Sequence, residues 1–224
     1  MADVSMEMVK ELRQRTGAGI MDCKVALNES GADIEKAVEY IQKKGLAKAA
    51  KKAGAIAAEG VIHSYIHAGS RLGVLVEVNC QTDFVARSDD FKTFADQVGL
   101  QIASMTPLFV RREDVPEAQK VKQREIFEAQ MAEEAAQTGK KKPADVVAKI
   151  IEGKIDKWLQ ETCLVEQVSV VEGEKTIQQL ADQLSAKIGE KIAVRRFVRY
   201  ELGEGIEKQK SDLAADVAAA ISGT

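Results

Sequence analysis

Histidine, proline and aromatic residues are scarce in this sequence. Among its 224 residues are two histidines, three prolines and one tryptophan, and aromatic residues make up 4%. The two histidines, His63 and His67, do not complete a zinc site, which needs three or four ligands. Carboxylates are scattered, and nothing in the sequence forms a constellation for covalent chemistry. Because proline disrupts helix interiors, so few prolines favour a helix-rich architecture.

Paired cysteine motifs, long apolar runs and excess positive charge are also missing. Cys23, Cys80 and Cys163 form no CxxC pair and leave an odd count, and no apolar run has the length of a signal peptide or a membrane span. These absences predict a reduced, cytoplasmic protein that spans no membrane. The formal net charge of −3 argues against general nucleic-acid binding, which requires a basic surface.

What is present is a globular composition with a helical start. Hydrophobic residues make up 45% and charged residues 30%, enough for one or two domains with a substantial core. Residues 1–55 predict three short helices that form a module. The second carries Ile20, Cys23 and Leu27 on one stripe, and the third closes near Gly45.

The run from Lys43 to Lys52 holds five lysines and no acid. Such a run can contact RNA or the ribosome, or it can be the solvated face of a linker helix. No aromatic residue lies among the lysines to stack a base, which favours the solvated face.

Residues 56–112 and 161–203 predict the two parts of an α+β core. Residues 61–67 and 73–78 read as a hairpin, and residues 191–201 as a third strand, which makes an antiparallel three-stranded sheet with flanking helices. We expect the third strand to present Ile192, Val194, Val198 and Tyr200 on one side and Ala193 and Phe197 on the other. Arg195, Arg196 and Arg199 either bind RNA or protect an edge strand from aggregation.

The hairpin register bears on whether Cys80 and His63 form a nucleophilic dyad. If the turn pairs His67 with Gly73, then Cys80 lies opposite Gly60 and its thiol points away from the face that carries His63. A slip of one residue would reverse this facing.

Two further helical segments are predicted. Residues 113–160 form two helices around a turn at 138–143, which indicates an antiparallel helical hairpin, a coiled-coil arm projecting from the core. Residues 204–224 form a C-terminal helical module, with Ser211 as the cap and Leu213, Val217 and Ile221 on one side.

The stretch from Asn79 to Ala86 links a predicted strand to a helix that begins at Ser88. Connectors of this kind run over the surface and often carry function. Phe84 and Val85 are open to two interpretations: they fold back into the core, or they form a wedge offered to a partner.

Three segments resemble bacterial translation elongation factor Ts. They are Asn-Cys-Gln-Thr-Asp-Phe-Val-Ala at 79–86, Glu-Leu-Arg-Gln-Arg-Thr-Gly-Ala-Gly-Ile-Met-Asp-Cys-Lys at 11–24, and Phe-Val-Arg-Tyr-Glu-Leu-Gly-Glu-Gly-Ile-Glu-Lys at 197–208. They occur in the family's order. The resemblance implies a ubiquitin-associated-like (UBA-like) fold for the N-terminal module.

The resemblance also implies a guanine nucleotide exchange factor, which is not an enzyme of covalent chemistry and needs no cofactor or metal. Its expected partner is elongation factor Tu, GDP-bound and nucleotide-free. In the family, the segment matching Thr82, Asp83, Phe84 and Val85 pushes into the nucleotide domain of elongation factor Tu and disturbs its Mg²⁺ site. The N-terminal contact is expected at Arg13, Ile20 and Met21. The alternative from the residues is a ribosome- or RNA-associated binding module.

The sequence departs from the family at two points. Family members commonly have methionine where this chain has Ile20, which changes the fit of that contact. Long members carry two core subdomains, whereas this chain has room for one and the arm. Short members can compensate by forming a homodimer.

Overall fold

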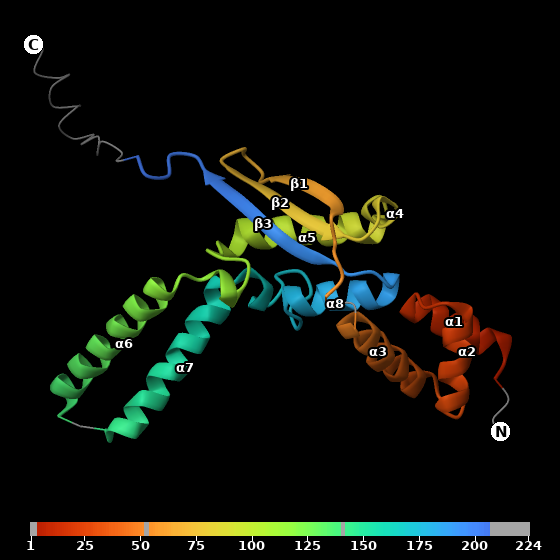
Figure 1. Ribbon diagram of the computed structural model, residues 1–224, viewed down its shortest axis with the longest axis horizontal. Helices are drawn as coiled ribbons and strands as arrows, with labels where there is room; N and C mark the ends of the chain where they lie inside the picture. The colour runs from red at the N-terminus through yellow and green to blue at the C-terminus, as the bar shows by residue number, and fades with distance from the viewer. Residues whose placement is uncertain (1–3, 52–53, 140–141, 207–224) are drawn as a thin grey trace, which may run out of the picture.

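A computed structural model describes residues 4–51, 54–139 and 142–206. Its elements follow the predicted α+β class (Figure 1). In chain order they are α1 (Met6–Thr16), α2 (Ile20–Glu29), α3 (Ile34–Lys51), β1 (Glu59–Ile66), β2 (Leu72–Cys80), α4 (Asp83–Ala86), α5 (Asp89–Met105), η1 (Arg112–Asp114), α6 (Glu117–Thr138), α7 (Ala144–Thr162), η2 (Leu164–Glu166), α8 (Ile177–Ile188) and β3 (Ala193–Glu201). The C-terminal helix expected after Ser211 lies outside the described residues.

The N-terminal helices pack around a small core of their own. Its fully buried members come from all three helices (Val9, Leu12, Cys23, Ala26, Leu27 and Ala37). Gly17 ends α1 in the left-handed conformation, and its N–H donates to the carbonyl of Arg13 at 2.7 Å. Ile20, expected on one stripe with Cys23 and Leu27, is exposed instead, because as the first residue of α2 it lies outside the small core.

The third helix was expected to end near Gly45, and this prediction is wrong: α3 continues to Lys51. Gly45 lies against α8 rather than ending the helix. A Cβ atom at this position would come within 2.8 Å of the Cβ of Ala186, which is closer than two carbon atoms pack. Glycine is therefore used here for the close approach of two helices.

The sheet has the order β1-β2-β3, with antiparallel pairing throughout. One face packs against α5 and α8 and forms the main core, which includes Val74, Val76, Val78, Phe91, Phe94, Ile102, Leu164, Ile177 and Val194. β3 is an edge strand, as predicted. Within the described ranges, none of the helices has the length and apolar character that crossing a bilayer requires.

Two details of the predicted sheet are wrong. His63 pairs with Val76, and Cys80 pairs with Glu59, which is one residue away from the expected register. The loop is tighter than assumed because Gly69 and Ser70 adopt positive φ (88° and 54°), so that His67 N–H donates to the carbonyl of Leu72 at 2.9 Å.

The second error concerns the sides of β3. A bulge shifts the pairing between Glu77 and Val78, which face Arg196 and Val194 respectively. A bulge adds one residue to a strand and so reverses the alternation beyond it. As a result Val194 and Phe197 share the core side, while Val198 and Tyr200 are exposed.

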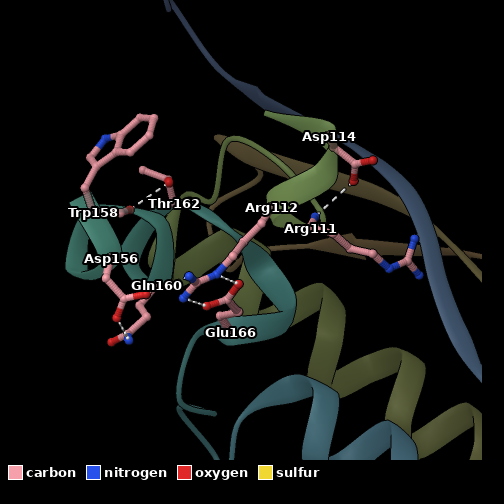
Figure 2. A network of polar contacts seen from close by, with 8 residues as sticks. All are labelled: Arg111, Arg112, Asp114, Asp156, Trp158, Gln160, Thr162 and Glu166. Atoms are coloured by element: carbon pink, nitrogen blue, oxygen red, sulfur yellow. Dashed lines mark hydrogen bonds and ion pairs between the residues drawn. The ribbon is translucent and has the colours of Figure 1, made fainter. Parts of the chain in front are cut away.

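The arm is anchored by ion pairs at its root (Figure 2). α6 and α7 run beside each other away from the sheet (Figure 1). Arg112 in η1 donates to both carboxylate oxygens of Glu166 in η2, and also to Asp156 Oδ1 in α7 at 2.6 Å. Arg111 reaches the carbonyl of Val194 in β3 at 2.8 Å. These contacts tie both ends of the arm to the core.

Candidate partner-binding site

An exposed aromatic side chain stands on the single turn of helix that follows β2. Phe84 is 80% exposed, whereas Val85 packs against the main core and Ala86 is buried. Of the two interpretations, the core one holds for Val85 and is wrong for Phe84. The segment therefore presents one aromatic ring to solvent, while its neighbours hold it to the protein.

The turn is fixed where it enters α5. Ser88 caps α5 by accepting from the N–H of Phe91 at 3.4 Å, and its hydroxyl donates to the carbonyl of Val85 at 2.8 Å. The cap seen in the sequence therefore also holds the end of α4. Because α4 is so short, such contacts at its ends, rather than its own hydrogen bonds, define its position.

The start of the turn is held by Glu190, which follows the left-handed C-cap Gly189 of α8. The Glu190 carboxylate accepts from the N–H of Gln81 at 3.1 Å, the N–H of Thr82 at 3.0 Å and the hydroxyl of Thr82 at 2.7 Å. In return, Lys191 N–H donates to the side-chain oxygen of Gln81 at 3.3 Å. Glu190 is not recognisable from the sequence alone, because it lies 108 residues from Thr82 and no local pattern links the two residues.

Asp83 lies beside the aromatic ring and carries an accessible charge. Its carboxylate pairs with Arg87 at 2.8 Å, one helical turn away, and both side chains are exposed. An exposed pair with this spacing contributes only about 0.3–0.5 kcal/mol. Asp83 can therefore exchange Arg87 for another partner at little cost.

Cys80 is buried at the base of the turn and is not set up as a nucleophile. Its thiol donates to the carbonyl of Thr82 at 3.1 Å. Burial raises the pKa of Cys80 to about 11, with the nearby charge of Glu190 as the next cause. A thiol with so high a pKa is almost entirely protonated at neutral pH and reacts slowly.

His63 does not activate Cys80 as a nucleophile. In the observed register His63 and Cys80 share one face of the sheet, contrary to the expectation, but Cys80 lies four residues beyond the partner of His63, about 13 Å along the strand. His63 Nε2 contacts Asp96 at 3.0 Å instead. Among the residues that the structure describes, no group of three or more His, Cys, Asp and Glu side chains could hold a metal ion.

A second exposed apolar patch lies on the N-terminal module. Met21 is 71% exposed and Ile20 49% exposed at the start of α2, and Arg13 is exposed in the last turn of α1. The three residues flank the turn made by Gly17 and Gly19. The structure therefore brings Arg13, Ile20 and Met21 into one region of the surface.

Both patches lie toward the same end of the molecule. Along its long axis, α4 and the N-terminal helices are at the end opposite to the arm (Figure 1). α8 passes between them: its Ala186 meets Gly45 of α3, and Glu190 just beyond it holds the turn with Phe84. One helix therefore contacts the supports of both patches.

The arginines of β3 are engaged with carboxylates. Arg195 and Arg196 both donate to Glu77, at 2.8 and 2.6 Å, and Arg199 donates to Glu201 at 2.8 Å. Hydrogen bonds from Arg195 and then Arg196 lower the pKa of Glu77 to about 2. This pairing favours the edge-strand interpretation over phosphate binding.

Surface connectors held by a folded scaffold often carry binding residues, so the anchored turn with its exposed Phe84 is a candidate protein-binding site. Comparison with known proteins identifies the family. The Elongation factor TS family matches residues 6–204. The sequence is 56% identical over 221 residues to elongation factor Ts of Desulforamulus reducens, with 99% of each chain covered.

Other relatives are similar over most of the chain. Elongation factor Ts of Carboxydothermus hydrogenoformans is 54% identical over 218 residues, covering 97% of this chain and 98% of its own. Elongation factor Ts of Geobacter sulfurreducens is 52% identical over 217 residues, covering 97% of this chain and 98% of its own. This chain belongs to the elongation factor Ts family, whose members take part in translation elongation.

Proposed function

We propose that this protein is a guanine nucleotide exchange factor for elongation factor Tu. It promotes GDP release by presenting the segment Thr82, Asp83, Phe84 and Val85 to the nucleotide domain and disturbing the Mg²⁺ site there. Phe84 is the residue that enters the partner, while Val85 stays packed against the core and holds the segment in place. The observation that carries the proposal is Phe84, 80% exposed on a turn anchored at both ends. It acts without covalent chemistry or a cofactor of its own. Translation takes place in the cytoplasm, which is its proposed location.

The energetics of exchange follow from linkage. A protein that binds nucleotide-free elongation factor Tu more tightly than the GDP complex weakens GDP binding by the same factor. A thousandfold faster release corresponds to about 4 kcal/mol. Burying one phenylalanine side chain contributes about 1.5–3 kcal/mol, so Phe84 supplies a large part and other contacts supply the rest.

The remaining contribution has two proposed sources. Asp83 brings a negative charge close to the Mg²⁺ site of the partner, and Mg²⁺ tolerates little distortion of its octahedral ligands. Arg13, Ile20 and Met21 form a second contact with the nucleotide domain. Their position at the same end of the molecule as α4 supports contact with a single partner (Figure 1).

The proposed domains are an N-terminal module (1–55), a core in two parts (56–112 and 161–203), the arm (113–160) and a C-terminal module (204–224). Separate apolar clusters for the N-terminal helices and the sheet support the first boundary. A homodimer is also proposed. The apolar residues on the sheet face opposite the main core favour it: among the described residues, Ile62, Ile66, Leu75, Val198 and Tyr200 are exposed there.

The direct test is GDP release from elongation factor Tu, measured with and without this protein at several salt concentrations. We expect much faster release that depends weakly on salt. The alternative, a ribosome- or RNA-associated module, predicts no acceleration, together with RNA binding that falls steeply as salt rises. No acceleration at any protein concentration would refute the exchange function.

A further inference from the structure

We infer that Glu190 is the positioning residue for the turn that carries Phe84. The inference rests on the proposed exchange function. In it, Glu190 does not touch the partner but keeps the turn in the orientation in which Phe84 projects.

The contacts of Glu190 all go to the start of the turn. One carboxylate oxygen, Oε2, accepts from the backbone N–H groups of Gln81 and Thr82, and the other, Oε1, accepts from the hydroxyl of Thr82. All three donor distances lie between 2.7 and 3.1 Å. Hydrogen bonds to a charged acceptor are stronger than those between neutral groups.

The geometry of Thr82 shows that this contact replaces an ordinary cap. Thr82 occupies the N-cap position of α4 with extended backbone (φ −130°, ψ 152°), yet its side chain makes no capping hydrogen bond. Threonine at this position ordinarily accepts from the helix N–H groups. Here its hydroxyl donates to Glu190 instead, so the start of α4 is tied to the end of α8 and not to its own first turn.

The position of Glu190 suits it to this task. It follows the C-cap Gly189 of α8, a helix that belongs to the main core through Ile177, Leu180 and Ala181. The salt bridge from Lys187 to Asp90 at 2.8 Å also joins α8 to the first turn of α5. The turn with Phe84 is therefore held between α5 and α8, which both pack in the main core.

Two substitutions separate positioning from charge. Glu190→Ala removes all three acceptor contacts. Glu190→Gln keeps them, because its amide oxygen can accept from both backbone N–H groups while its NH₂ group donates to the oxygen of Thr82. If Glu190 acts by positioning the turn, Glu190→Gln should release GDP at nearly the rate of the unchanged protein, and Glu190→Ala should release it more slowly.

The experiment measures GDP release from elongation factor Tu for the full-length protein, both Glu190 variants, Phe84→Ala and the double variant Glu190→Ala, Phe84→Ala. We expect Glu190→Ala to slow release about tenfold, which corresponds to about 1.4 kcal/mol, and Glu190→Gln to stay within about threefold. The double variant should lose less than the product of the two single effects, since Glu190 acts in part through the position of Phe84. Glu174→Ala is the matched control, because it removes the same charge from an exposed position.

A measurement that needs no partner accompanies the kinetics. Amide hydrogen exchange of Gln81 and Thr82 should become faster in Glu190→Ala, while Glu174→Ala should leave it unchanged. If the unchanged protein does not accelerate release, the exchange function fails, and amide exchange alone still decides whether Glu190 holds the turn.

Three results would overturn the inference. The first is an unchanged amide exchange rate in Glu190→Ala. The second is a loss of activity in Glu190→Gln as large as in Glu190→Ala, which would assign the effect to charge. The third is independent, fully multiplying effects of Glu190→Ala and Phe84→Ala, which would mean that Glu190 does not act through the position of Phe84.

Discussion

Replacing Phe84 by alanine tests whether its ring serves the fold or a partner. Because the side chain is 80% exposed, it makes few contacts that stabilise the folded state. Substitutions at such exposed positions change the free energy of unfolding by less than about 0.5 kcal/mol. We therefore expect the melting temperature of Phe84→Ala to stay within about 2 °C of the unchanged protein.

The chain contains a matched control for the same chemical change. Phe91 lies in the next helix and is fully buried in the main core. Removing a buried phenylalanine side chain costs about 3–5 kcal/mol. In a protein of this length each kcal/mol lowers the melting temperature by about 2–4 °C, so Phe91→Ala should melt roughly 6–20 °C lower.

For GDP release the order of the two variants should be reversed: Phe84→Ala should have the larger effect. Loss of the 1.5–3 kcal/mol that Phe84 gains on burial should slow GDP release roughly 10- to 150-fold. Phe91→Ala, measured well below its melting temperature, should release GDP at nearly the normal rate. The assay follows the release of a fluorescent GDP analogue from elongation factor Tu, with thermal unfolding recorded for each variant. A folded Phe84→Ala protein with normal release would refute the wedge mechanism.

Other predictions address the supports of the site. Gly45→Ala should destabilise the protein by about 1–3 kcal/mol through its clash with Ala186, and adding Ala186→Gly should restore most of the loss in urea unfolding; no recovery would contradict the packing of α3 on α8. The pKa of Glu77 is lowered from its ordinary value of 4.5 to about 2. The stability that ionised Glu77 gives the folded state is therefore complete above pH 4.5 and is lost as the pH falls toward 2. Glu77→Gln should flatten the acid dependence of unfolding in this window, and identical slopes would argue against the pair of arginines. Replacing residues 121–150 by a short Gly/Ser linker leaves the root at Arg112 intact and should preserve GDP release; loss of release with a folded core would give the arm a role in exchange. Alkylation of Cys80 in the folded protein should be slow at pH 7.5 and should rise toward its pKa of about 11, whereas fast labelling at neutral pH would contradict its burial.

Local patterns predicted the elements well where the cause was local. The helix start at Ser88 is an example, because Ser88 caps the helix that directly follows it. This cap depends on residues a few positions apart, and the sequence displays it directly. The three antiparallel strands and the helical arm follow from periodicity for the same reason.

The failures have tertiary causes. Gly45 reads as a helix end, because the sequence does not show that Ala186 occupies the space next to it. The bulge in β3 is a property of pairing with β2, so alternation within β3 alone predicts the wrong side for Val198 and Tyr200. The sequence does not determine the exposure of Phe84, because an apolar side chain in a connector fits either environment.

Glu190 shows why the complete site could not be predicted from the sequence. The residues of the turn are recognisable together because they are contiguous, whereas the carboxylate that orients them comes from a distant loop. Since the same helix meets Gly45 of the N-terminal module and leads to Glu190, a displacement of α8 would move both exposed patches relative to each other. A capping box, a salt bridge to α5 and close contact with α3 oppose such a displacement. In the proposed complex, in which one partner engages both patches, these contacts of α8 would keep the two patches in a fixed relative position.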